Sequence, residues 1–166
     1  QWGGGWLAEL GFSDFAGSTL VHSTGGAAAL AGAMILGPRL GRFTKSGAPA
    51  PLKPFAASSI PLVTIGVFIL WLGWFGFNGG SQLAMGTAVD AIAVSTIFMN
   101  TFLAGAGGVI GAAIITRLHF GKTDVVQMLN GCIGGLVAVT AEPLAPSPFA
   151  AILIGACLLY TSPSPR

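Results

Sequence analysis

Residues 14–36 read DFAGSTLVHSTGGAAALAGAMIL and are followed by Gly37 and Pro38. The stretch contains no lysine or arginine and is mostly apolar or small. A helix needs about 20 such residues to cross the apolar core of a bilayer. Glycine and proline directly after an apolar run are a common helix stop. The stretch therefore predicts a membrane-spanning helix over residues 14–36.

The remainder of the chain contains four more apolar stretches, each bounded by turn-forming or charged residues. They cover 59–77, 89–116, 125–140 and the residues from 149 to at least 156. None alternates apolar and polar residues as a half-buried strand does. The sequence therefore predicts an all-α fold, a polytopic transmembrane helix bundle.

The composition excludes several classes of protein. Of the 166 residues, 53% are hydrophobic and 7% are charged, whereas roughly a quarter are charged in soluble globular domains. A soluble enzyme, a nucleic-acid-binding protein and a disordered chain are all disfavoured. Cys132 and Cys157 lack the spacing of a metal site or a disulfide framework. We expect no metal and no cofactor.

The basic residues occur in every second connection between the predicted helices. The connections 37–58 and 117–124 contain them, at Arg39, Arg42, Lys45, Lys53, Arg117 and Lys122. The other connections, 1–13, 78–88 and 141–148, contain none. Because basic loops stay on the cytoplasmic side, 37–58 and 117–124 are predicted to be cytoplasmic. We expect a multi-pass protein of the cell membrane, the bacterial inner membrane in particular.

Small residues recur four positions apart within the predicted helices. The pairs are Gly25 with Ala29, Gly107 with Gly111, and Gly131 with Gly135. This spacing lets two helix backbones approach closely in a membrane. It predicts tight helix packing and says nothing of what the protein transports or binds.

Three polar residues interrupt the first apolar stretch at intervals of four. On one helix, Asp14, Ser18 and His22 would form a polar stripe about 12 Å long. Asp14 is placed to cap backbone N–H groups at the outer end of the helix. His22 lies too deep for capping. It is either satisfied by a neighbour or faces a pore, because a polar group facing lipid is costly.

A cluster of aromatic residues precedes Asn78, Gly79, Gly80 and Ser81. Its members are Trp71, Trp74, Phe75 and Phe77. One interpretation is an interfacial aromatic belt. The other is a site for a weakly hydrated cation, which ring faces attract. Trp2 is placed to add a ring face, and Ser81 to accept a hydrogen bond from the cation.

Several motifs together resemble the ammonium transporter family (Amt/Mep/Rh). They are WGGG at residues 2–5, DFAGSTLVH at 14–22, LGWFGFNGGS at 72–81 and TAEP at 140–143. The resemblance implies eleven transmembrane helices in two inverted halves, assembled as a homotrimer with a pore in each subunit. Residues 1–156 would then hold helices five to eight and part of helix nine.

The resemblance also implies roles for five residues. Trp2, Phe77 and Ser81 would bind ammonium at the outer face, and Phe77 would also gate the pore. Asp14 would organise that site, and His22 would be the first of two pore histidines. His119, in the expected cytoplasmic loop, does not match the second. The implied function is transport of ammonium or ammonia, with a cytoplasmic regulatory protein as a further partner.

Three alternatives differ from this interpretation in function. A member of the same family can act as an ammonium sensor, and an Rh-type member as a gas channel. An intramembrane enzyme would use Asp14 and His22 as acid and base, but their offset of about 12 Å along a helix disfavours it. We therefore expect no enzymatic activity.

The two ends of the chain suggest that it is part of a longer membrane protein. It begins with Gln1 and not with methionine. The last ten residues, CLLYTSPSPR at 157–166, resemble translated sequencing-adapter sequence. We expect this tail to be foreign to the protein.

Overall fold

The computed structural model describes residues 2–38 and 58–161, and every regular element in these ranges is a helix. The helices are α1 (Trp6–Glu9), α2 (Leu20–Leu36), α3 (Ile60–Gly80), α4 (Ala88–Phe120), α5 (Val125–Val139) and α6 (Pro148–Thr161). The all-α fold class is confirmed. The predictions for Arg39, Arg42, Lys45, Lys53 and residues 162–166 concern positions outside the described residues.

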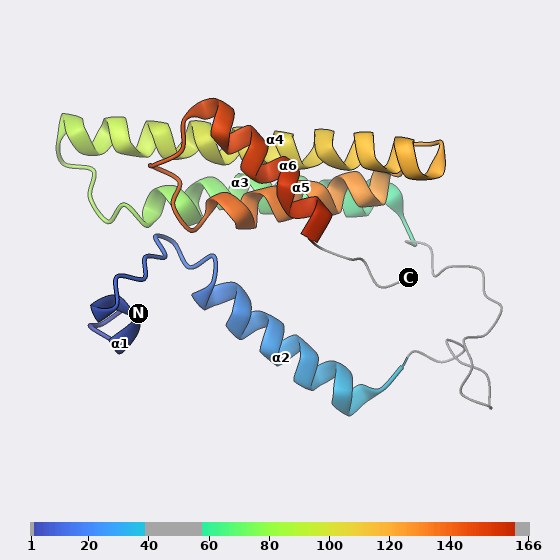
Figure 1. Ribbon diagram of the computed structural model, residues 1–166, viewed down its shortest axis with the longest axis horizontal. Coiled ribbons are helices and arrows are strands. Elements are labelled where there is room, and N and C mark those ends of the chain that lie inside the picture. Colours follow the sequence, from blue (N-terminus) through green and yellow to red (C-terminus); the bar gives the residue numbers. More distant parts are fainter. Residues whose placement is uncertain (1, 39–57, 162–166) are drawn as a thin grey trace.

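Helices α3 to α6 pack into one bundle, and α2 leans away from it (Figure 1). The α3 and α4 helices are long and apolar enough to cross a membrane, and α2, α5 and α6 are shorter apolar helices. No residue of α2 is buried. Helix α2 contacts the bundle through His22 in its first turn, and the loop that precedes the helix makes further contacts.

The described connections alternate between two ends of the bundle (Figure 1). The α3–α4 and α5–α6 connections lie toward one end, and the turn between α4 and α5 lies at the other. That turn follows Arg117, whose side chain donates to the carbonyl oxygen of Gly121. This alternation agrees with the alternation of basic and uncharged connections in the sequence.

Side chains mark the starts of three bundle helices. Thr87 and Asp90 form a reciprocal capping box at the start of α4. Asp124 accepts hydrogen bonds from two backbone N–H groups at the start of α5. Ser59 caps α3, with Pro61 in its first turn. Such caps satisfy N–H groups that have no partner within the helix.

Helix α2 begins at Leu20, so the prediction of a helix from residue 14 is wrong at that end. Gly17 has φ +98°, a left-handed conformation that a right-handed helix cannot contain. The Asp14 side chain also takes backbone N–H groups that an earlier helix start would use. The predicted stripe of Asp14, Ser18 and His22 on one helix is therefore also wrong.

Two other helix ends lie beyond their predicted positions. Helix α3 continues through Gly80, because Asn78 is buried with a hydrogen bond from its Nδ2 to Thr101 and Gly79 packs under Phe98. Helix α4 continues to Phe120, so His119 lies in its last turn and not in a loop. The prediction of a helix over 125–140 is confirmed by α5.

Glycines bring the backbones of α4, α5 and α6 into direct contact. A Cβ atom at Gly108 would overlap the carbonyl oxygen of Gly131, and one at Gly107 would overlap that of Ile152. Gly135 and Gly155 both pack on Ala104. The predicted close packing of these helices is confirmed. Gly25 has no such neighbour among the described residues, so its pairing with Ala29 stays a prediction.

Candidate functional site

The Asp14 carboxylate organises the loop that leads into α2. Asp14 is 2% exposed. Its Oδ1 accepts a hydrogen bond from the N–H of Gly17 at 3.2 Å, and its Oδ2 accepts from Thr19 and Leu20 at 2.9 Å each. Three N–H partners stabilise the charged carboxylate where it is buried. The Asp14 carboxylate satisfies backbone N–H groups as the sequence predicted, but from the loop before α2 and not from the first residue of the helix.

This loop is bound to the C-terminal end of α5. The N–H of Phe15 donates to the carbonyl oxygen of Ala141 at 2.7 Å, and that of Ala16 donates to Thr140 at 3.2 Å. The Ser18 hydroxyl donates to the carbonyl oxygen of Val137 at 2.7 Å. The last carbonyl groups of a helix lack partners within it. Here the loop supplies those partners and so positions the start of α2 against the bundle.

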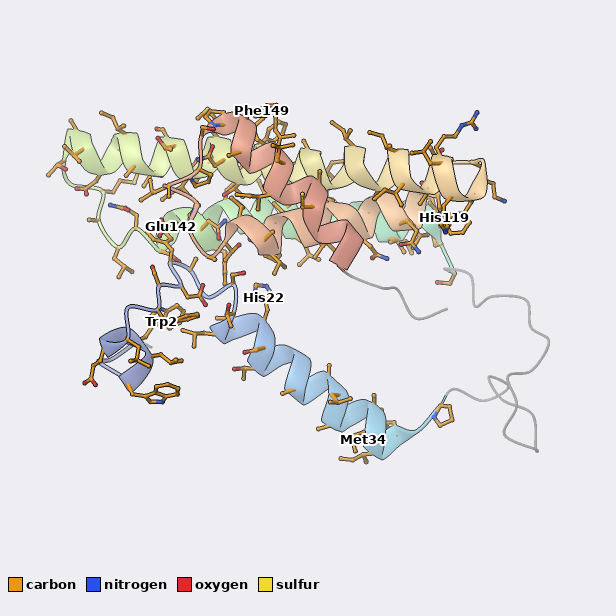
Figure 2. All side chains as sticks on the ribbon, in the orientation of Figure 1. Trp2, His22, Met34, His119, Glu142 and Phe149 are labelled. Carbon is orange, nitrogen blue, oxygen red and sulfur yellow. The ribbon has the colours of Figure 1, made fainter. Side chains whose placement is uncertain are left out.

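His22 is the third residue of α2, and its ring faces the bundle (Figure 2). The imidazole stacks on the Trp74 indole, with ring centroids 5.5 Å apart and planes 14° apart. It also meets the edge of Phe77 at 6.2 Å. Trp74 and Phe77 are themselves 5.8 Å apart. We call His22, Trp74 and Phe77 the three-ring cluster.

The histidine ring is also tied to the loop backbone. Its Nδ1 lies 3.3 Å from the carbonyl oxygen of Gly17 and 3.2 Å from that of Ser18. A carbonyl oxygen can only accept, so these contacts are hydrogen bonds when Nδ1 carries a hydrogen. The Nε2 atom of a neutral ring then remains as an acceptor. As the third residue of α2, His22 lies in the first turn of that helix, whereas the sequence predicted a position deeper in a helix.

Trp2 lies beside the same loop, near Asp14. Its Nε1 donates to the backbone carbonyl oxygen of Asp14 at 3.2 Å, and the side chain is 56% exposed. Its ring packs against Gly17, where a Cβ atom would lie 3.0 Å from the Trp2 Cη2 atom. No ring contact or hydrogen bond joins Trp2 to Phe77 in the described part of the chain.

Phe77 and Ser81 lie one turn apart at the end of α3. The Ser81 hydroxyl donates to the carbonyl oxygen of Phe77 at 2.7 Å. Its oxygen keeps the capacity to accept a further hydrogen bond. Phe77 is 37% exposed, so part of its ring is accessible. The structure thus places His22 in ring contact with Phe77, and Phe77 in a hydrogen bond with Ser81. Trp2 is hydrogen-bonded to Asp14 instead.

The sequence did not single out Trp74 or Thr140 as parts of this site. Trp74 was one of four clustered aromatic residues, and nothing in the sequence distinguishes it from Trp71. Thr140 was noted only within the TAEP motif. The structure joins the two residues, because the indole Nε1 of Trp74 donates to the Thr140 hydroxyl at 2.8 Å.

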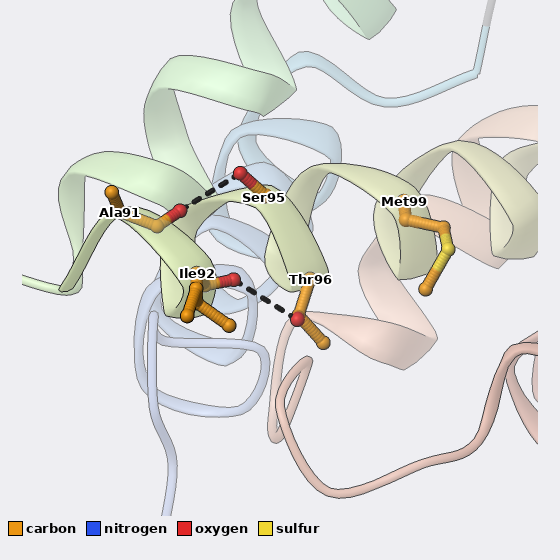
Figure 3. Close-up of a pocket in the computed structure, with 5 residues that line it drawn as sticks. All are labelled: Ala91, Ile92, Ser95, Thr96 and Met99. Atoms are coloured by element: carbon orange, nitrogen blue, oxygen red, sulfur yellow. Dashed lines mark hydrogen bonds between the residues drawn. The ribbon is translucent and has the colours of Figure 1, made fainter. Parts of the chain in front are cut away.

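Two surface hollows lie on other faces of α3 and α4. One is lined by Ala91, Ile92, Ser95, Thr96 and Met99 (Figure 3). Its two hydroxyl groups donate to carbonyl oxygens one turn earlier in α4, so they are satisfied within the helix. The other hollow is lined mainly by apolar side chains and glycines, between the end of α3 and the start of α4. None of Trp2, Asp14, His22, Phe77 and Ser81 lines either hollow.

Comparison with known proteins identifies close relatives of the chain. The profile of a family described as Ammonium Transporter Family matches residues 1–158. Ammonium transporter Amt2 of Archaeoglobus fulgidus is 43% identical over 164 residues, which cover 93% of this chain and 34% of that protein. The chain spans about a third of the length of the curated relatives it matches.

Two solved structures resemble the fold of this chain. A protein described as Sensor Amt Protein has a TM-score of 0.84 and 36% sequence identity, over 95% of this chain and 37% of that one. Mep2 of Candida albicans has a TM-score of 0.79 and 30% identity, over 95% of this chain and 33% of that one. Both similarities extend over nearly all of the chain.

Proposed function

Because the chain belongs to the ammonium transporter family, we propose that it forms part of a membrane pathway for ammonium or ammonia. The observation that carries this proposal is the three-ring cluster at the start of α2. It sets an imidazole against both an indole and a partly exposed phenyl ring. Such a position suits a group that meets a small polar molecule in an apolar passage.

Ammonium is first recruited at the outer face by Trp2, Phe77 and Ser81. The exposed Trp2 ring and the partly exposed Phe77 ring offer faces that attract a weakly hydrated cation. The Ser81 oxygen accepts an N–H bond from the bound ion, since its own hydrogen is donated to Phe77. Asp14 contributes by fixing the loop beside Trp2, and it does not touch the ion.

The ion then transfers its proton to water at the outer face before it passes Phe77. Entry of a charge into apolar surroundings costs several kcal/mol even where the protein relaxes. Desolvation favours the neutral form of an amine, so loss of the proton lowers that cost. The neutral ammonia is then hydrogen-bonded by His22 on its way through the membrane. Potassium cannot lose its charge, and the same barrier excludes it.

The rest of the assembly is proposed from what the resemblance to the family implies. The chain contributes residues 1–156 to the transporter domain, with the Arg117–Lys122 turn and residues 37–58 in the cytoplasm and Trp2 and Ser81 outside. A second pore histidine lies in another part of the full-length protein. The complete protein is a homotrimer in the cell membrane, bound on its cytoplasmic side by a regulatory protein. Its activity is transport, with no enzymatic step.

The test is uptake of methylammonium by the full-length protein with His22→Ala, with and without potassium as a competitor. We expect the uptake rate or the discrimination against potassium to fall at least tenfold, on the order of one hydrogen bond lost from the transition state. The matched control is His119→Ala, because His119 lies in the last turn of α4 against Phe120. Unchanged rate and selectivity in the His22 variant would refute the pore role.

A further inference from the structure

Thr140 lies where the end of α5 meets the loop before α2 and the Trp74 ring. Thr140 is fully buried and follows the last residue of α5. Its hydroxyl oxygen accepts from the Trp74 indole, and its backbone carbonyl accepts from Ala16. The same residue therefore contacts the loop before α2 and the ring that stacks on His22.

The direction of the Trp74–Thr140 hydrogen bond is fixed by a second bond. The Thr140 hydroxyl donates its only hydrogen to the carbonyl oxygen of Leu136 at 2.6 Å. Towards Trp74 it can therefore act only as an acceptor, and the indole N–H can only donate. The hydroxyl hydrogen is thus committed to α5, and the indole donates to the oxygen of the same hydroxyl.

A second tryptophan on α3 shows what the bond adds. Trp71 lies one turn before Trp74, and its Nε1 is buried with no hydrogen-bond partner among the described residues. Its ring packs between Phe68 and Phe102, at centroid distances of 6.3 and 5.4 Å. Packing alone thus holds Trp71. Trp74, which faces His22, is held by packing and by a directed bond to another helix.

From these contacts we infer that Thr140 is a positioning residue for the pore histidine. It orients the Trp74 indole, and the indole face then fixes the plane of the His22 ring. The inference rests on the proposed transport function, since it assigns Thr140 a role in the step at His22. It predicts that Thr140 affects the passage of ammonia and leaves recruitment at Trp2 and Ser81 unchanged.

The experiment measures methylammonium uptake by the full-length protein with Thr140→Val, which keeps the side-chain shape and removes the hydroxyl. We expect the maximal rate to fall about tenfold, the change that follows from an indole N–H left without a partner. The concentration at half-maximal uptake should stay within about twofold, because neither Trp2 nor Ser81 forms a hydrogen bond or ring contact with Thr140 or Trp74 among the described residues. Thr140→Ser, which restores the hydroxyl, should recover most of the rate.

The matched control is Thr116→Val. Thr116 is also buried and also donates to a carbonyl oxygen one turn earlier, that of Ala112 at 2.7 Å. No hydrogen bond joins its hydroxyl to an aromatic side chain in the described structure. If Thr116→Val lowers the maximal rate as much as Thr140→Val does, the effect is general to buried threonines and the inference is overturned.

A double-mutant cycle tests whether Thr140 acts through Trp74. Trp74→Phe removes the N–H that Thr140 accepts. In that background Thr140→Val should lower the rate less than twofold, because the bond is already absent. Two independent, multiplicative losses would overturn the inference. Should Thr140→Val fail to assemble, Trp74→Phe, which leaves α5 unaltered, is the remaining test. An unchanged maximal rate in that variant would overturn the inference.

Wild type and His22→Ala are measured in the same series. Absence of methylammonium uptake by the wild type, or an unchanged rate together with unchanged potassium selectivity in His22→Ala, would overturn the proposed function itself. A transporting wild type that responds to His22→Ala but not to Thr140→Val would overturn the positioning role alone.

Discussion

The loop at residues 14–18 and the seam between α4, α5 and α6 are joined to their neighbours in different ways. The loop makes directed hydrogen bonds to the end of α5 and to its own Asp14 carboxylate. The seam has glycines such as Gly108 and Gly131, whose backbones touch without side chains between them. The loop contact depends on particular hydrogen-bond donors and acceptors. The seam depends only on having no side-chain atoms between the two backbones.

This difference predicts how each region responds to substitution. A hydrogen bond that is removed leaves the surrounding backbone free to shift, at a net cost of about 1 kcal/mol for an ordinary pair. An atom added between two touching backbones has no space to occupy, because a packed interior has few voids. Substitutions in the seam should therefore cost more folding free energy. Substitutions in the loop should lower transport by more than their cost in folding free energy explains.

The largest effect is expected for Gly108→Ala in the seam. A Cβ atom there would overlap the carbonyl oxygen of Gly131, which is backbone and cannot rotate away. We expect a loss of about 3 kcal/mol or more of folding free energy, at the upper end for overpacked interiors. The measurement is thermal unfolding of the purified full-length protein in detergent.

The matched control for the seam is Gly73→Ala in α3, where no described atom lies within 4 Å of the added methyl group. Alanine favours a helix by about 1 kcal/mol over glycine, so this variant should be as stable as the wild type or more stable. Equal destabilisation by both substitutions would show that the seam has no special role.

The next largest effect is expected for Asp14→Ala in the loop. The change removes a charged acceptor from three backbone N–H groups in a buried position. Hydrogen bonds to charged groups contribute about 1.5–3 kcal/mol each, with part recovered as water enters. We expect a loss of about 2–3 kcal/mol in unfolding and a fall in uptake that exceeds tenfold, because the loop sets both Trp2 and His22.

Asp90→Ala is the control for Asp14, since Asp90 also bonds at the start of a helix, but in an exposed capping box with Thr87. Loss of such a cap costs about 1 kcal/mol, and uptake should change little. A similar decrease in uptake for both variants would contradict a specific role of the Asp14 loop.

The helices could be predicted from the sequence, while several of their ends could not. Long apolar runs allow only helices in a membrane, because each backbone polar group needs a partner within its own segment. The start of α2 depends on the Asp14 side chain and on the positive φ of Gly17, and a glycine in an apolar run is equally compatible with a helix. The end of α3 depends on Thr101, which is distant in sequence.

The site could be predicted only in part for the same reason. Asp14, His22, Phe77 and Ser81 belong to motifs that resemble a known family, so the sequence named them. Which of Trp71 and Trp74 faces His22 depends on the rotation of α3 about its axis. That rotation is set by contacts with α4 and α5, and no local pattern in α3 encodes them.

A smaller effect is expected for Gly17→Ala. It has two causes, backbone strain and a clash with neighbouring side chains, and Gly11→Ala as a control separates them. Both glycines have a positive φ, +98° and +83°, so either substitution incurs the strain of a left-handed residue, about 1–2 kcal/mol. Only at Gly17 would the methyl group meet other atoms, 2.5 Å from Val21 Cγ2 and 3.0 Å from Trp2 Cη2. Gly17→Ala should therefore raise the methylammonium concentration at half-maximal uptake, while Gly11→Ala should not. An equal rise in both would attribute the effect to backbone strain and not to displacement of Trp2.

The smallest effect is expected for Ser18→Ala, which removes one hydrogen bond between the loop and α5. The Ser18 hydroxyl reaches the carbonyl oxygen of Val137 at 2.7 Å, whereas the exposed Ser95 hydroxyl in α4 returns to its own helix at Ala91. Loss of the first bond should cost about 1 kcal/mol, and Ser95→Ala should be near neutral. Because the Ser18 carbonyl also lies beside His22 Nδ1, uptake should fall about twofold to fivefold in Ser18→Ala, within the range for one weakened contact. If Ser18→Ala matched Ser95→Ala in both unfolding and uptake, the backbone bonds of Phe15 and Ala16 would suffice to hold the loop on α5, and the side chain would have no part in it.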